Sequence, residues 1–147
     1  MLTPEKIKAL EQIQSAINSK YGFKNGIPSV NMGPCGPFAK AFFEIWNGLF
    51  SEKVIICFLF EKGTTKCAHC FLKLPSGDYY DGGNGIVKAE SIDKLISPDF
   101  VIEEMNEYDE AELDKNAYGL NRAYPQCSTY DHEHTKEVIE KYLSESS

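Results

Sequence analysis

The pattern of apolar positions predicts two amphipathic helices in the first third of the chain. The first helix starts at the N-cap hydroxyl of Thr3, has a proline in its first turn, and stops at Gly22. Its apolar positions recur at helical spacing: Ile7, Leu10, Ile13 and Ile17. After a glycine- and proline-rich loop over 22–34, the second helix begins at Cys35. Its apolar stripe consists of Phe38, Phe42, Ile45, Trp46 and Leu49.

The pattern then changes from helical to extended. Three strands are predicted, over residues 54–60, 66–74 and 78–83, with Pro75-Ser76-Gly77 as a three-residue hairpin loop between the last two. The remaining elements that we expect are a helix over 91–96, a strand over 100–105, and helices over 109–118 and 135–143. Two helices followed by an antiparallel meander indicate the α+β class, and 147 residues suit one domain spanning 1–147.

Charge and cysteine content narrow the possible functions. The 15 basic and 22 acidic side chains give a net charge of −7, which argues against nucleic-acid binding because that function needs a basic surface. The longest apolar run is far shorter than the roughly 20 residues that span a bilayer, and the N-terminus has no secretory signal. We therefore expect no membrane association, and a protein that is cytoplasmic or exported without a cleaved signal peptide. An odd number of cysteines, five, indicates free thiols.

Cys35 lies at a predicted helix N-terminus, a position that favours a reactive thiol. It begins the second predicted helix, and the unpaired N–H groups and dipole at a helix N-terminus lower a thiol's pKa. The flanking Gly33 and Gly36 allow a substrate backbone to approach closely. Nucleophilic attack on a carbonyl also needs oxyanion donors, and we expect the backbone N–H of Cys35 and the side-chain amide of Asn31 to serve.

His69 is the histidine best placed to act as a base, and the hairpin register decides which residue orients it. With the three-residue loop, His69 faces Gly83, and Asp81 lies diagonally on the same face, within roughly 7 Å. A two-residue loop would instead bring Asn84 opposite His69 and turn Asp81 to the other face. We favour Asp81 as the orienting residue, with Asn84 as the register alternative.

A zinc site is the competing interpretation of the same region. Cys67 and Cys70 form a C-x-x-C motif, and the ligand set could be completed by Cys127, His132 and His134. Side chains alternate along a strand, however, so that Cys67 and Cys70 should point to opposite faces. The sequence also has no second C-x-x-C. We therefore expect no metal and no cofactor.

The residues over about 28–86 resemble the papain-like cysteine-peptidase superfamily. The motif NMGPCGPFA (31–39) opens a long helix, a strand with His69 follows, and YYDGG (79–83) comes next. The run DGGNG (81–85) is also similar to the transglutaminase and arylamine N-acetyltransferase branch. The resemblance implies a nucleophile at Cys35, a general base at His69, an orienting acid at Asp81, and an acyl-enzyme intermediate. Papain itself differs, with a glutamine as oxyanion donor and a tryptophan just after its cysteine.

Two functions of different classes follow. The first is a small thiol hydrolase or acyltransferase that attacks an amide, isopeptide or thioester bond in a peptide or protein substrate. A basic substrate is compatible with the acidic charge, and the aromatic residues that could line the cleft are Tyr79, Tyr80 and Tyr118. The second is a non-catalytic acidic binding or inhibitor module on the same fold.

Overall fold

The computed structural model describes residues 2–117 and 130–147. Its first element is α1 (Pro4–Tyr21), which begins and ends as the sequence predicts. The Thr3 hydroxyl accepts a 3.2 Å hydrogen bond from the Lys6 N–H, and Gly22 ends the helix at a φ of 70°. The residues that α1 buries are Ala9, Leu10, Ile13 and Ile17. The predicted amphipathic helix is therefore confirmed.

The segment between the first two helices is more ordered than the predicted loop. It contains a short hairpin, β1 (Phe23–Lys24) and β2 (Ile27–Pro28), followed by the 3₁₀ turn η1 (Ser29–Asn31). Helix α2 (Cys35–Leu49) then starts at the predicted cysteine. Its buried stripe includes Phe38, Phe42 and Trp46, whose rings stack along the helix. The hairpin was missed because strands of two residues carry no periodic signal.

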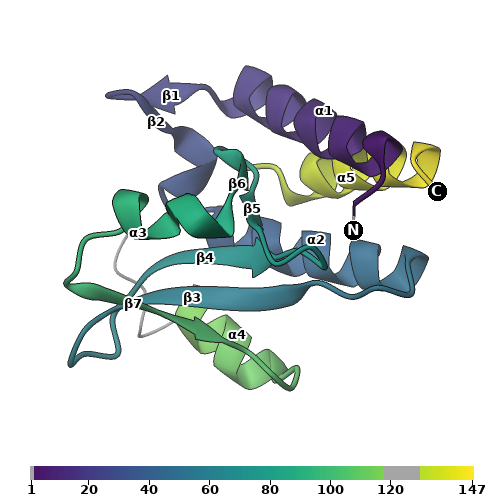
Figure 1. Ribbon diagram of the computed structural model, residues 1–147. Helices are drawn as coiled ribbons and strands as arrows, with labels where there is room; N and C mark the ends of the chain where they lie inside the picture. Colours follow the sequence, from purple (N-terminus) through teal and green to yellow (C-terminus); the bar gives the residue numbers. More distant parts are fainter. Residues whose placement is uncertain (1, 118–129) are drawn as a thin grey trace.

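Five antiparallel strands form one sheet in the spatial order β6-β5-β4-β3-β7. Their bounds are β3 (Ile55–Glu61), β4 (Cys67–Lys73), β5 (Tyr79–Asp81), β6 (Gly85–Val87) and β7 (Phe100–Glu104). Strand β6 was not predicted, because the glycines before it indicated only the end of β5. The α+β class with an antiparallel sheet is confirmed (Figure 1).

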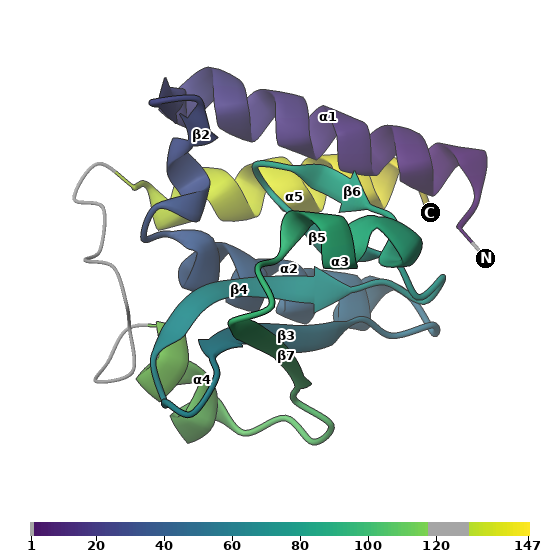
Figure 2. The ribbon, with the colours of Figure 1, turned by 60° about the vertical axis from the view of Figure 1, so that its left-hand side comes forward.

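The helices lie on both faces of this sheet. Helix α2 packs against β4 on one side and against α5 (His132–Glu145) on the other, and α5 in turn packs against α1 (Figures 1 and 2). Helix α4 (Glu110–Ala117) contacts α2 and β4. The opposite face of the sheet carries η2 (Ala89–Ser91) and α3 (Ile92–Leu95). None of the helices in the described ranges has the length and apolar character needed to cross a membrane.

A β-bulge interrupts the ladder between β3 and β4. Leu59 pairs with His69, but the next residue, Phe60, pairs with Cys67, so that Ala68 has no partner on β3. A bulge adds one residue to one strand and increases the local twist. The bulge therefore lies beside the histidine that the sequence singles out.

Candidate active site

Cys35 is the first residue of α2, and it is 2% exposed. The local sequence forces the chain to turn here: Gly33 has a φ of 120°, which favours glycine, and Pro34 is the N-cap residue. The carbonyl of Pro34 accepts from the Phe38 N–H at 2.9 Å, so the first turn is closed. The backbone N–H groups at the start of a helix have no acceptors within the helix itself, and the backbone N–H of Cys35 lies in that first turn.

His69 and Asp81 are brought together by the register that the sequence predicts. Leu72 faces Tyr80 and Lys73 faces Tyr79, as a three-residue loop requires, and Gly77 has the left-handed φ of 91°. The Nε2 atom of His69 lies 3.1 Å from the Oδ2 atom of Asp81. The predicted register and the proximity of this pair are therefore confirmed.

Asp81 is a buried carboxylate held by donors from several segments. Besides His69, it accepts from the Asn31 side-chain amide at 3.0 Å and from the Gly83 N–H at 2.9 Å. The Asn84 backbone N–H donates at 2.6 Å and its side-chain amide at 3.1 Å. Burial raises the pKa of Asp81, but the hydrogen bonds from His69, Asn84 and Asn31 outweigh it and leave the pKa below its ordinary value. Asp81 is therefore an anion at neutral pH.

Two predictions for the asparagines need correction. Asn84 does not replace Asp81 beside His69, because the three-residue loop sets the register; it donates to Asp81 instead. The Asn31 amide, expected to stabilise an oxyanion, donates to the Oδ1 atom of Asp81. Both asparagines thus surround the carboxylate and fix its orientation.

The pKa of His69 reflects its position between the thiol and the carboxylate. Burial lowers the pKa, whereas the negative charges of Cys35 and Asp81, and hydrogen bonds to both, raise it to about 10. The imidazole therefore interacts with the side chains of both other members of the predicted triad. Because Asp81 occupies Nε2, the Nδ1 atom is the one left for proton exchange with Cys35.

Helix α1 contributes two positioning residues that sequence reasoning missed. The side-chain amides of Gln14 and Asn18 both donate to the Gly83 carbonyl at 3.0 Å. These residues lie four positions apart, on one face of α1, and that polar spacing is the signal that could have identified them. A Cβ atom on Gly83 would come within 2.5 Å of the Pro28 Cβ atom, so only glycine fits between these segments. The loop that donates to Asp81 is thus fixed from two sides.

The sequence argument against a zinc site placed the Cys67 and Cys70 side chains on opposite faces of β4, and this placement was wrong. The bulge at Ala68 places the sulfurs of Cys67 and Cys70 on the same side of β4, 3.8 Å apart, in the buried core. Hydrogen bonds to Cys35 and Cys67, together with burial, raise the pKa of Cys70 well above its ordinary value. In the ranges 2–117 and 130–147, no three His, Cys, Asp or Glu side chains are grouped to hold a metal ion. Cys127 lies outside these ranges.

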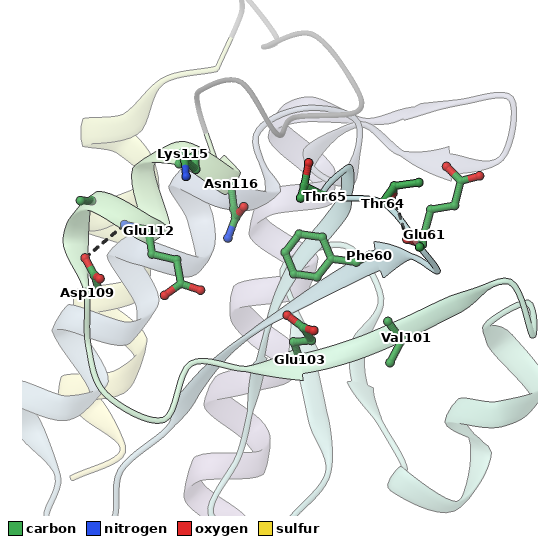
Figure 3. A pocket seen from close by; sticks show the side chains of 12 residues that line it. Phe60, Glu61, Thr64, Thr65, Val101, Glu103, Asp109, Glu112, Lys115 and Asn116 are labelled. Atoms are coloured by element: carbon green, nitrogen blue, oxygen red, sulfur yellow. Dashed lines mark hydrogen bonds between the residues drawn. The ribbon is translucent and has the colours of Figure 1, made fainter.

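Two cavities are relevant to a substrate. A cavity of about 180 Å³ adjoins the catalytic candidates and is lined by His69, Asp81 and Tyr79, among others. A second, of about 610 Å³, lies between the β3–β4 turn, β7 and α4, and neither Cys35 nor His69 lines it (Figure 3). Of the predicted cleft aromatics, Tyr79 and Tyr80 both line the small cavity. Tyr80 is otherwise buried, and its hydroxyl donates to the Leu10 carbonyl. Tyr118 lies outside the described residues.

No family model, no curated protein and no solved structure matches the chain. The functional argument therefore depends on the chemistry of the site. The site contains a thiol at a helix N-terminus, an imidazole that interacts with it and a buried carboxylate on that imidazole. These are the group types that a nucleophile, a base and an orienting group require.

Proposed function

We propose that this chain is a small cysteine-dependent hydrolase or acyltransferase acting through Cys35, His69 and Asp81. The observation that carries the proposal is the position of the His69 imidazole, which hydrogen-bonds to the buried Asp81 at 3.1 Å and interacts with the side chain of Cys35. The order of a cysteine at a helix start, a histidine on one strand and an acid on the next is that of the papain-like superfamily.

In this mechanism Cys35 and His69 exist as a thiolate and an imidazolium. The thiolate attacks the carbonyl carbon of an amide, isopeptide or thioester, and the backbone N–H of Cys35 donates to the resulting oxyanion. As the tetrahedral intermediate collapses, His69 gives its proton to the leaving amine or thiol, and an acyl-enzyme on Cys35 remains. His69 then takes a proton from water, or from an acceptor nucleophile, whose attack releases the acyl group and restores the thiolate.

Asp81 acts on the imidazole rather than on the substrate. Its carboxylate accepts from Nε2, which fixes the ring orientation and the tautomer and stabilises the positive charge. The donors from Asn31, Gly83 and Asn84 keep Asp81 ionised and immobile. Hydrogen bonds of this kind, made to a residue that itself holds a reacting group, fix the geometry of an active site.

A binding module that keeps these residues without catalysis is the second candidate, and one observation favours it. Cys35 is only 2% exposed, as is common for a structural thiol, whereas a nucleophile has to become accessible when the substrate binds. The two candidates differ in the reactivity that they give to Cys35.

Alkylation by iodoacetamide distinguishes the enzyme from the binding module. At pH 6, Cys35 should be alkylated at least tenfold faster than the other four thiols, because in this proposal the His69 imidazolium holds it as a thiolate. The labelling is measured by mass spectrometry of tryptic peptides. His69→Ala and His69→Gln should remove this excess, whereas the matched variant His134→Ala should keep it. Uniform slow labelling of all five thiols would favour the binding module, provided that circular dichroism shows folded protein.

The pH dependence provides a sharper measurement on the same protein. The pKa of His69 is raised to about 10, so the imidazolium persists from acid pH up to that value. The alkylation rate of Cys35 should therefore change less than about threefold between pH 6 and 8, whereas an ordinary thiol, with a pKa near 8.5, gains roughly 50- to 100-fold. An ordinary thiol titration at Cys35 would contradict the ion pair.

A further inference from the structure

We propose that the cavity beside His69 binds an apolar side chain or short acyl chain of the substrate whose carbonyl Cys35 attacks. The inference deepens the proposed function and rests on it. It concerns the substrate class, which the triad alone leaves open.

Two of the three proposed catalytic residues, His69 and Asp81, line the cavity, whereas Cys35 does not. Its lining comes from strands β3, β4, β5 and β6 and from Ile92 and Leu95 of the short helix α3. Figure 2 shows α3 beside these strands. His69 and Asp81 form one wall. The His69 ring stacks on Phe71 at a centroid distance of 5.5 Å, so the apolar surface begins directly at the imidazole. A group seated there lies against the residue that transfers the proton.

The lining selects against charged groups. Among the described residues that line the cavity, only His69 and Asp81 carry charge, and these two are paired with each other. A charged substrate group would lose its hydration without gaining a counter-charge. The rest of the lining is mainly aliphatic and aromatic, with Leu59, Val87 and Ile96 completing the walls. An uncharged apolar group is therefore the occupant that this surface stabilises.

The volume limits the size of that occupant. About 180 Å³ equals the space of roughly six water molecules at about 30 Å³ each. Pockets that enclose a whole drug-sized ligand measure about 300–1,000 Å³. The cavity therefore holds one side chain or a short acyl chain, and the remainder of a peptide substrate would lie outside it.

Exposure indicates that the cavity is open to solvent at α3. Leu95, at the end of α3, is 68% exposed, and the His69 side chain keeps 19% exposure, compared with 2% for Cys35. Of these two reacting groups, the imidazole is thus the more accessible, and it lines the cavity. Filling the cavity would remove water from His69 during the reaction.

A series of p-nitrophenyl esters tests the inference, because only the acyl chain varies. Acylation of Cys35 by the acetyl, butyryl and hexanoyl esters is followed by p-nitrophenol release and intact-protein mass spectrometry. Each rate constant is divided by that of glutathione with the same ester. The corrected rate should rise about threefold to fourfold for each methylene that enters the cavity, and the negatively charged succinyl ester should react more slowly than butyryl.

Leu95→Asp places a charge at the mouth of the cavity, at an exposed position where the fold tolerates it. We expect it to lower the hexanoyl-to-acetyl rate ratio about tenfold or more. Leu49→Asp is the matched control, since Leu49 is a 43% exposed leucine that does not line the cavity, and it should keep the wild-type ratio.

The possible outcomes distinguish the inference from the function on which it rests. Acylation of Cys35 that depends on His69 but shows no dependence on acyl length overturns the cavity and keeps the enzyme. If the acylation rate depends on acyl length to the same extent in Leu95→Asp as in the wild type, the cavity inference is also overturned. If no ester acylates Cys35 and its alkylation is ordinary, the proposed function fails, and the cavity inference fails with it.

Discussion

The buried carboxylate of Asp81 and the acidic cavity beside α4 show two ways in which one chain places negative charge. Asp81 is 6% exposed and accepts hydrogen bonds from three separate segments, those of Asn31, His69 and the loop 83–84. The acidic cavity is lined by four carboxylates: Glu61, Glu103, Asp109 and Glu112. Of these, Glu103, Asp109 and Glu112 are exposed to solvent. Figure 3 shows them around Phe60, with the Glu112 N–H donating to Asp109.

The comparison between Asp81 and the acidic cavity shows that the volume and the charge of a cavity do not by themselves identify a reactive site. The acidic cavity has the greater volume, about 610 Å³ compared with 180 Å³. Three of its four carboxylates are exposed, however, and water screens their charges. The donors around Asp81 act in a buried environment, where a fixed hydrogen bond has a larger effect. Organised donors, rather than the amount of charge, therefore mark the candidate site.

Neutralising Asp81 should produce the largest effect. Asp81→Asn removes the charge that stabilises the imidazolium, and its amide would place N–H groups against the backbone donors of Gly83 and Asn84. We expect acylation by p-nitrophenyl butyrate to fall by about 10²- to 10⁴-fold. A decrease smaller than threefold in a folded variant would place Asp81 outside the reaction and make it comparable to the solvated acids.

Crowding the loop that donates to Asp81 should give an intermediate effect, in stability. Gly83→Ala places a methyl group 2.5 Å from the Pro28 Cβ atom and 2.7 Å from the Asn31 amide nitrogen, and should lower the free energy of unfolding by about 1–3 kcal/mol. Gly48→Ala is the matched control, because nothing lies within 4 Å of its new methyl group and it sits inside α2. It should raise stability by about 0.5–1 kcal/mol. Urea unfolding measures both; equal effects would mean that the close approach at Gly83 has no energetic consequence.

Neutralising the acidic cavity should have the smallest effect. Glu112→Gln changes one exposed carboxylate to an amide of the same shape, and we expect the unfolding free energy to stay within about 0.5 kcal/mol. The rate of acylation by p-nitrophenyl butyrate should change less than twofold. If it falls tenfold instead, the larger cavity belongs to the active site, and the contrast between the two regions is lost.

The positions of Cys35, His69 and Asp81 could be predicted because each depends on a local signal. The N-cap at Thr3 and the start of α2 at Cys35 follow from capping chemistry and apolar spacing. The approach of His69 to Asp81 follows from the length of one hairpin loop, which is closed by Gly77. These features need no knowledge of distant contacts.

What could not be predicted depends on contacts between distant segments. Asn31 meets Asp81 only because η1 packs beside the end of β5, 50 residues later in the sequence. Gln14 and Asn18 reach Gly83 across 69 and 65 residues. No glycine or other turn residue in the sequence indicates the bulge at Ala68. The argument from strand alternation therefore placed the Cys67 and Cys70 side chains on the wrong faces. Each of these contacts depends on tertiary packing, which the local sequence pattern does not predict.

Because of the bulge, we expect β4 to tolerate the loss of one residue at a single position. Ala68 is the residue without a partner on β3, while Cys67 and His69 on either side keep theirs. If Ala68 were deleted, the remaining pairs could join into an uninterrupted ladder with every neighbouring side chain on its present face. At a paired position within the strand, a deletion would exchange the two faces of everything beyond it.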